Sequence, residues 1–197
     1  MSKNAMPVVK ILLLGYQAVG KTTLIHTYLH KKGDILGTAG LGFEQKIFNY
    51  NGKDIKVHIF DSAGQERFRN IAQNQISAVQ GLLVVYDITD RNTFNGAQSW
   101  LDYCLKNFGD TKTYLVLANK IDLADQRQVS TEEGSQLALK YNAYFHETSA
   151  KLGDNVENSF NQAITTLITR QNFDNKENTQ KERTSNRKKD NACCLII

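Results

Sequence analysis

The chain has 197 residues, of which 41% are hydrophobic and 22% are charged. This length predicts one domain with a short additional segment, and the composition excludes a chain that is disordered throughout. The formal net charge of +4, from 24 basic and 20 acidic residues, is too small to indicate a nucleic-acid partner, and we expect none. No apolar run approaches the roughly 20 residues that cross a bilayer.

The surplus of positive charge lies near the C-terminus. Residues 176–190 contain six basic and three acidic side chains, and the apolar periodicity ends at about residue 171. Such a composition cannot bury enough apolar surface to fold by itself. We therefore predict a flexible N-terminus over 1–7, a folded domain over 8–170 and a disordered, polar and basic tail over 171–197.

Strands and helices alternate along the predicted domain. The predicted strands are Val8–Leu14, Phe43–Tyr50, Ile55–Phe60, Leu82–Tyr86, Tyr114–Ala118 and Ala143–His146. The predicted helices are Lys21–His30, Thr93–Phe108, Thr131–Tyr141 and Val156–Ile168. Asn51-Gly52 predicts a tight hairpin turn between the second and third strands, because both of its central residues need a positive φ. This order indicates an α/β fold, a doubly wound sheet with helices on both faces.

A glycine-rich motif follows the first strand. Gly15 to Thr22 matches G-x-x-x-x-G-K-[ST], in the strand-to-helix setting that the motif requires. Its backbone N–H groups can surround a polyphosphate at a helix N-terminus, where the helix dipole favours anions. Lys21 supplies a cation for the β- and γ-phosphates, and the Thr22 hydroxyl can bind Mg²⁺. The predicted phosphate-binding residues are Gly15, Ala18, Val19, Gly20, Lys21, Thr22 and Thr23.

A second motif, Asp61 to Gln65, follows the third strand. Asp61 lies at the carboxyl end of that strand, beside the predicted phosphate loop, where a carboxylate can hold the metal through water. Gly64 allows its N–H to approach a γ-phosphate. Gln65 can orient an attacking water, so Gln65 and Lys21 are the candidate catalytic residues. Alone, D-x-x-G is more often an ordinary turn, and its position after the phosphate loop gives it weight.

Two further polar motifs, Asn119–Asp122 and Glu147–Lys151, follow the last two strands. The Asp122 carboxylate complements the N1–H and 2-amino donors of guanine, whereas adenine would leave it unpaired. A backbone N–H near Ala150 can donate to guanine O6, and two lysine stems can pack over the base. The predicted base-binding residues are Asn119, Lys120, Asp122, Ser149, Ala150 and Lys151.

Together, these four motifs resemble the Ras superfamily of small GTPases over about residues 8–170. The segments Ala63–Phe68 and Leu83–Thr89, with Thr93-Phe94 and Trp100, are most similar to its Rab branch. The resemblance implies a six-stranded, mostly parallel sheet of order 2-3-1-4-5-6, in which only the second strand is antiparallel. It implies a GTP-binding and GTP-hydrolysing switch that recruits effectors to membranes in vesicle trafficking, with GTP or GDP and Mg²⁺ bound.

The resemblance also implies residue roles and partners. Thr38 is expected to bind Mg²⁺ together with Thr22 and Asp61. An exchange factor, a GTPase-activating protein and effectors are expected to bind Gly33–Phe43 and Ser62–Gln73. The protein is expected to act as a monomer.

The C-terminus carries a different signal. Cys193 and Cys194, followed by Leu195-Ile196-Ile197, match the Cys-Cys-x-x-x ending of Rab-like proteins and a C-a-a-X prenylation motif. This predicts a prenyl transferase and a prenyl-binding carrier as partners, and a lipid-anchored protein on the cytoplasmic face of an intracellular membrane. The alternative is an unmodified hydrophobic terminus. The third cysteine, Cys104, is expected to be buried, and an odd count favours a reducing compartment.

Some positions depart from the family pattern. Gln17 and Ala18 occupy the phosphate loop where relatives usually have small residues or glycine, which predicts slow hydrolysis. Thr38 lies seventeen residues after Lys21, where relatives space this threonine by about nineteen, and Gly33 replaces a usual aromatic residue. These two differences predict weak nucleotide retention.

Effector identity and catalysis remain open at this stage. Ala39 and Gly42 replace residues common in Rab-like proteins, so no effector can be inferred. The alternative function is a nucleotide-holding membrane adaptor with impaired or lost GTPase activity. An ATP-using P-loop kinase is excluded by the Asn119–Asp122 motif.

Overall fold

The computed structural model describes residues 6–31, 41–62 and 74–170. The predicted tail, 171–197, and most of the predicted N-terminal segment lie outside these residues. None of the helices in the described ranges combines the length and apolar character needed to cross a bilayer.

The six strands form one sheet of order β2-β3-β1-β4-β5-β6. Only the β2–β3 pair is antiparallel, and every other neighbouring pair is parallel. The strands are β1 (Val8–Leu14), β2 (Leu41–Tyr50), β3 (Lys53–Ser62), β4 (Gly81–Asp87), β5 (Thr113–Asn119) and β6 (Tyr144–Thr148). The predicted strand order and the single antiparallel strand are therefore confirmed.

The β2–β3 hairpin is longer than the two predicted strands. Its pairing runs from Leu41 opposite Ser62 to Tyr50 opposite Lys53. Asn51 and Gly52 form the connecting turn, with φ of 50° and 77°, so the predicted turn is confirmed.

The helices follow the prediction with small shifts at their ends. They are α1 (Lys21–Tyr28), α3 (Arg91–Phe108), α4 (Thr131–Lys140) and a last helix over 156–170. The chain also forms 3₁₀ turns at Gly109–Thr111 and Ile121–Gln126, and a helical turn over 74–77 that was not predicted. Helix α1 ends before the predicted His30, since His30 has a left-handed φ of 52° that a right-handed helix cannot continue through.

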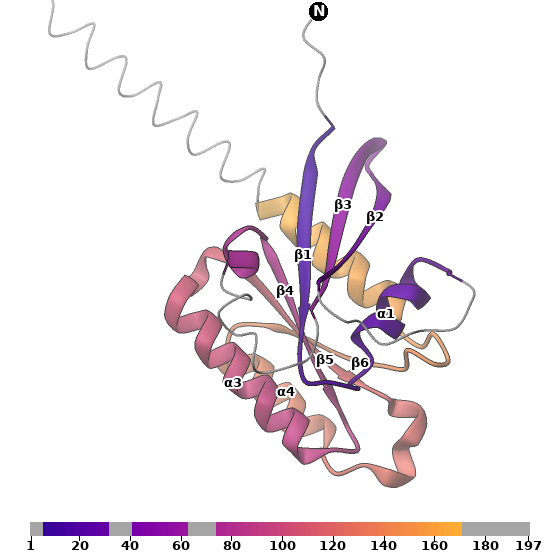
Figure 1. Cartoon of the computed structure of the whole chain (residues 1–197), viewed down its shortest axis with the longest axis vertical. Coiled ribbons are helices and arrows are strands. Elements are labelled where there is room, and N and C mark those ends of the chain that lie inside the picture. Colours follow the sequence, from indigo (N-terminus) through magenta and orange to yellow (C-terminus); the bar gives the residue numbers. More distant parts are fainter. Residues whose placement is uncertain (1–5, 32–40, 63–73, 171–197) are drawn as a thin grey trace, which may run out of the picture.

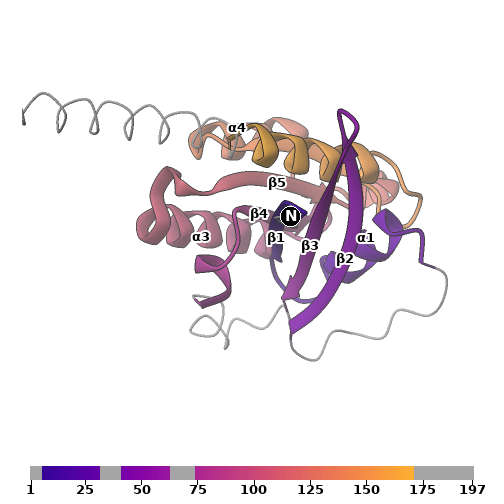
Figure 2. The same cartoon turned by 90° about the horizontal axis from the view of Figure 1, so that it is seen from above.

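Apolar residues fill both faces of the sheet. Along β1, Ile11 and Leu13 pack into the core beneath α1 and the 156–170 helix, whereas Leu12 and Leu14 pack into the core beneath α3 and α4. Figure 1 shows these elements around the sheet, and Figure 2 shows the 156–170 helix and α3 on opposite sides of it. Cys104 is fully buried in the second core, as predicted.

The parallel arrangement decides where polar loops meet. Because β1, β3, β4, β5 and β6 run in the same direction, their carboxyl ends lie at one edge of the sheet. Ligands of open α/β sheets bind outside this edge. All four predicted motifs follow strands that end here.

Candidate nucleotide-binding site

The loop between β1 and α1 requires glycine at both of its ends. Gly15 and Gly20 have φ of 145° and 98°. A Cβ at Gly15 would lie 2.3 Å from the carbonyl oxygen of Val85, and one at Gly20 would lie 2.4 Å from Asn119 Nδ2. The loop therefore passes too close to β4 and to Asn119 for any side chain at these two positions.

Lys21, at the start of α1, is folded back beneath this loop. It is 6% exposed, and its Nζ donates hydrogen bonds to the carbonyl oxygens of Gly15 at 3.0 Å and Tyr16 at 2.8 Å. Burial lowers the pKa of Lys21 to about 8, although the nearby Asp61 carboxylate acts in the opposite direction. The side chain is thus a buried amine whose charge costs solvation free energy and gains from an added anion.

Thr22 and Asp61 bring hard oxygen ligands together beside Lys21. The Thr22 hydroxyl donates to Asp61 Oδ2 at 2.6 Å, which joins the start of α1 to the end of β3. Asp61 is 4% exposed, and the adjacent Ser62 hydroxyl donates to the carbonyl oxygen of Leu13. A hydroxyl and a carboxylate of this kind are ligands that Mg²⁺ accepts, so the residues present fit the predicted metal.

Asn119, at the end of β5, joins three loops. Its Nδ2 donates to the carbonyl oxygen of Val19 at 2.8 Å, and its Oδ1 accepts from the Ala150 N–H at 3.0 Å and from the Thr148 hydroxyl at 3.2 Å. Ala150 N–H, one of the amides expected to face guanine, is therefore used within the protein. The phosphate loop and the loop after β6 are held at a fixed separation.

The loop after β6 is also tied to η3 (Ile121–Gln126) and to α1. The Ser149 hydroxyl donates to Asp122 Oδ1 at 2.6 Å and accepts from the Leu152 N–H at 3.1 Å. Thr27 of α1 donates its hydroxyl to the carbonyl oxygen of Ala150 at 2.7 Å. The Ser149 hydroxyl therefore positions the Asp122 carboxylate, and Thr27 holds the loop that carries Ser149.

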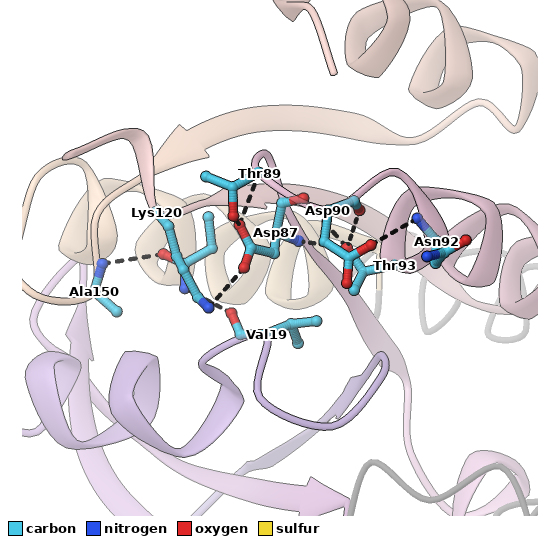
Figure 3. Close-up of polar contacts among 9 residues, drawn as sticks. Val19, Asp87, Thr89, Asp90, Asn92, Thr93, Lys120 and Ala150 are labelled. Atoms are coloured by element: carbon cyan, nitrogen blue, oxygen red, sulfur yellow. Dashed lines mark hydrogen bonds and ion pairs between the residues drawn. The ribbon is translucent and has the colours of Figure 1, made fainter. Parts of the chain in front are cut away.

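A pocket of about 220 Å³ opens among these loops. It is lined by Gly20, Thr23, Asn119, Lys120, Asp122, Leu123, Ala150 and Lys151. The predicted phosphate-binding and base-binding residues thus meet in one place. Leu123 was not predicted. Figure 3 shows Val19, Lys120 and Ala150 on three separate loops in this region.

Sequence reasoning missed three polar residues that order this region. They are Thr27, which binds the loop after β6; Thr148, which binds Asn119; and Asp87, whose Oδ2 lies 2.6 Å from the Nζ of Lys120. Asp87 had a sequence signal, because it ends an apolar strand at the ligand-binding edge, and Thr148 lies within the Glu147–Lys151 motif. Thr27 had no such signal.

Other predicted residues lie outside the described ranges. They are Thr38, Gly64, Gln65, Cys193 and Cys194, with most of Gly33–Phe43 and Ser62–Gln73. Of the two unusual loop residues, Gln17 and Ala18 are both exposed, and Ala18 has a left-handed φ of 63°.

Comparison with known proteins agrees with the geometry. Residues 10–169 match the model of the Ras family. The chain belongs to the Ras family. It is 38% identical to "Ras-related protein Rab-8A" from Bos taurus, Rattus norvegicus and Mus musculus, over 162 residues that cover 81% of this chain and 78% of each relative.

This Ras-family protein is therefore a Rab-like small GTPase. It binds guanine nucleotide and hydrolyses GTP as a molecular switch in membrane trafficking, together with regulators and effectors. Its similarity to Rab-8A indicates an association with membranes that cycles with the switch. The predictions of family, fold and enzyme class are confirmed, and the alternative of an adaptor without GTPase activity is not favoured.

Proposed function

We propose that one guanosine triphosphate lies along the carboxyl edge of the sheet, with its phosphates over Lys21 and its base against Asp122. The observation that carries this proposal is the set of hydrogen bonds from Asn119 to Val19 and Ala150. They join the phosphate loop to the loop after β6, so the two predicted ends of the ligand site belong to one surface.

At the phosphate end, Lys21 neutralises charge on the β- and γ-phosphates, and the N–H groups of the loop surround them. Thr22, Asp61 and Thr38 would hold Mg²⁺, which supplies further neutralisation of the phosphate charge. Gly64 donates its N–H to the γ-phosphate. Gln65 accepts a hydrogen bond from a water molecule and orients that water for attack on the γ-phosphorus.

At the nucleoside end, Asp122 accepts hydrogen bonds from N1–H and the 2-amino group of guanine. Its hydrogen bond from Ser149 restrains the carboxylate before the ligand binds, which reduces the entropic cost of recognition. The stems of Lys120 and Lys151 cover the base, and Ala150 shapes the pocket.

The switch acts at a membrane surface. Prenyl groups on Cys193 and Cys194 would anchor the chain to the cytoplasmic face of an intracellular membrane, after modification by a prenyl transferase and delivery by a prenyl-binding carrier. A single lipid chain binds a bilayer only marginally, so the second cysteine or the basic tail adds the required affinity. An exchange factor, a GTPase-activating protein and effectors bind Gly33–Phe43 and Ser62–Gln73.

Gln17 sets the rate of hydrolysis within this scheme. Its long amide side chain is exposed in the phosphate loop, where it crowds the γ-phosphate and the approach of a partner's arginine. We expect Gln17→Gly to accelerate single-turnover GTP hydrolysis. Equal rates in the two proteins, with and without an activating protein, would exclude this role.

Calorimetry on the nucleotide-stripped full chain tests the proposed function. With Mg²⁺ present, we expect GDP to bind at least roughly 10³-fold more tightly than ADP, because the Asp122 acceptors are left unpaired by adenine. Lys21→Met should weaken binding of GDP strongly. The matched control is Lys140→Met, which removes an exposed lysine at the end of α4 and should change nothing. Equal affinities for GDP and ADP would refute the proposal.

A further inference from the structure

Asp87 ends β4 directly beside Asn119 of β5 in the sheet. It is 7% exposed, and both of its carboxylate oxygens are engaged. Oδ1 accepts hydrogen bonds from the Thr89 N–H at 2.8 Å and the Thr89 hydroxyl at 2.7 Å. Oδ2 lies 2.6 Å from Lys120 Nζ, and Figure 3 shows these contacts converging on the carboxylate.

The backbone around Asp87 is held as firmly as its side chain. Its N–H donates to the Thr93 hydroxyl at 3.0 Å, and that hydroxyl contacts the carbonyl oxygens of Asp87 and Asp90. The Asp90 side chain accepts from the Asn92 N–H and caps α3. The Asp87 carboxylate therefore extends from a backbone that is fixed by hydrogen bonds where β4 leads into α3.

This carboxylate keeps its charge although it is buried. Burial acts to raise the pKa of Asp87, but the hydrogen bonds from Lys120 and Thr89, with the charge of Lys120, hold the pKa below its ordinary value. Asp87 is thus ionised at neutral pH and can hold an ammonium group. The Asp87 side chain is 9% exposed and that of Lys120 is 30% exposed, so loss of the ammonium would leave a buried carboxylate without its cation.

The two lysines that line the nucleoside pocket differ in this respect. Lys120 has a left-handed φ of 71°, and its ammonium is bound to Asp87. Lys151 lines the same pocket but forms no ion pair with any residue in the described ranges. Lys120, on one wall of the pocket, is therefore restrained by an ion pair, whereas Lys151 has no such restraint among the described residues.

We propose that Asp87 is a positioning residue for the nucleoside. By fixing the Lys120 ammonium, it holds the lysine stem as a rigid wall against the base and slows nucleotide release. This inference rests on the proposed binding of guanine nucleotide at the same pocket.

A double-mutant cycle on the full chain tests the inference. The rate of release of a fluorescent GDP is measured for Asp87→Asn, Lys120→Met and the double variant. We expect Asp87→Asn to accelerate release about tenfold, since a neutral amide cannot hold the ammonium in place. In the Lys120→Met background, the same substitution should change the rate by less than about twofold, because its effect acts through Lys120.

Two controls make the cycle specific. With Lys151→Met in place of Lys120→Met, the effects of the two substitutions should multiply independently. Asp90→Asn changes a carboxylate three positions after Asp87, in the turn that leads into α3. It retains a good helix N-cap and should leave the release rate unchanged. The same Asp87–Lys120 cycle on the free energy of unfolding of the nucleotide-free chain should also be non-additive, which gives a readout independent of nucleotide.

Each outcome has a defined meaning. If wild-type protein does not bind GDP, the proposed function fails before the inference is reached. If it retains GDP but Asp87→Asn has the same effect with and without Lys120, Asp87 acts through the fold and the inference is overturned. If Asp87→Asn does not fold, Thr89→Val replaces it: loss of one hydrogen bond to Asp87 should accelerate release by a smaller factor, and only when Lys120 is present.

Discussion

The two ends of the ligand site are built in different ways. At the nucleoside end, the side chains of Asn119, Ser149 and Thr27 form hydrogen bonds that join separate loops. At the phosphate end, two glycines set the path of the main chain, and the ammonium of Lys21 donates to carbonyl oxygens of its own loop.

This difference predicts that the nucleoside end determines which base is bound, whereas the phosphate end contributes affinity through charge. Hydrogen bonds between protein groups fix the nucleoside end, so the choice of base depends on a geometry that is already formed. The phosphate end is governed by charge, since a buried amine with a lowered pKa gains most when an anion approaches. Substitutions at the two ends should therefore change different observables.

The largest effect is expected at the nucleoside end. Asp122→Ala should lower the affinity for GDP by roughly 10³-fold, because the guanine donors lose their charged acceptor. It should also abolish the preference for GDP over IDP, which lacks the 2-amino group. Competition binding with the two nucleotides measures both effects. A variant that still prefers GDP would show that base selection lies elsewhere.

The next effect concerns the residue that joins the two ends. Asn119→Ala should lower the free energy of unfolding by about 3 kcal/mol, because it leaves the Val19 carbonyl, the Ala150 N–H and the Thr148 hydroxyl unsatisfied. Urea denaturation of the nucleotide-free chain measures it. Asn107→Ala, which removes an exposed amide bonded within α3, is the matched control and should cost less than about 0.5 kcal/mol. Similar losses for both would contradict the bridging role.

A third prediction uses the titration of Lys21. Its pKa is about 8 in the nucleotide-free chain, and bound phosphates should raise it by favouring the charged form. Above about pH 8, a neutral Lys21 must therefore take up a proton when GDP binds. The affinity for GDP should then fall as the pH rises through that range. At pH 8, titrations in two buffers of different ionisation enthalpy should show an uptake of about half a proton. An uptake that stays constant between pH 7 and 8.5 would argue against a buried, partly neutral Lys21.

The smallest effect is expected within the phosphate loop. Ala18 has a φ of 63°, a conformation that costs an L-residue about 1 kcal/mol and glycine little. Ala18→Gly should therefore stabilise the chain by up to about 1 kcal/mol in thermal or urea unfolding. Ala138→Gly, the same change inside α4, should have the opposite sign. If both substitutions destabilise, the loop is not strained at Ala18.

Much of this architecture could be read from local patterns. Buried parallel strands appear as continuous apolar runs, as in Leu82–Tyr86, and Asn51-Gly52 specifies its turn by the φ angles it tolerates. The end of α1 was misplaced because the left-handed turn at His30 has no glycine to announce it. The helical turn at 74–77 is too short to show a period.

Local sequence patterns were sufficient to predict the order of strands and helices and the edge where the motifs gather. They also predicted the chemistry of five site residues: Lys21, Thr22, Asp61, Asn119 and Asp122. Each of these features is encoded by a motif of fixed spacing whose residues lie close together in the sequence. The tertiary structure alone decided that Asp87 holds Lys120, that Thr27 holds the loop after β6 and that the Ala150 N–H is used by Asn119. These contacts join residues that are between 31 and 123 positions apart in the sequence. Such pairs meet only after the sheet has brought the ends of its strands to one edge. A local sequence pattern cannot predict contacts between residues so far apart in the chain.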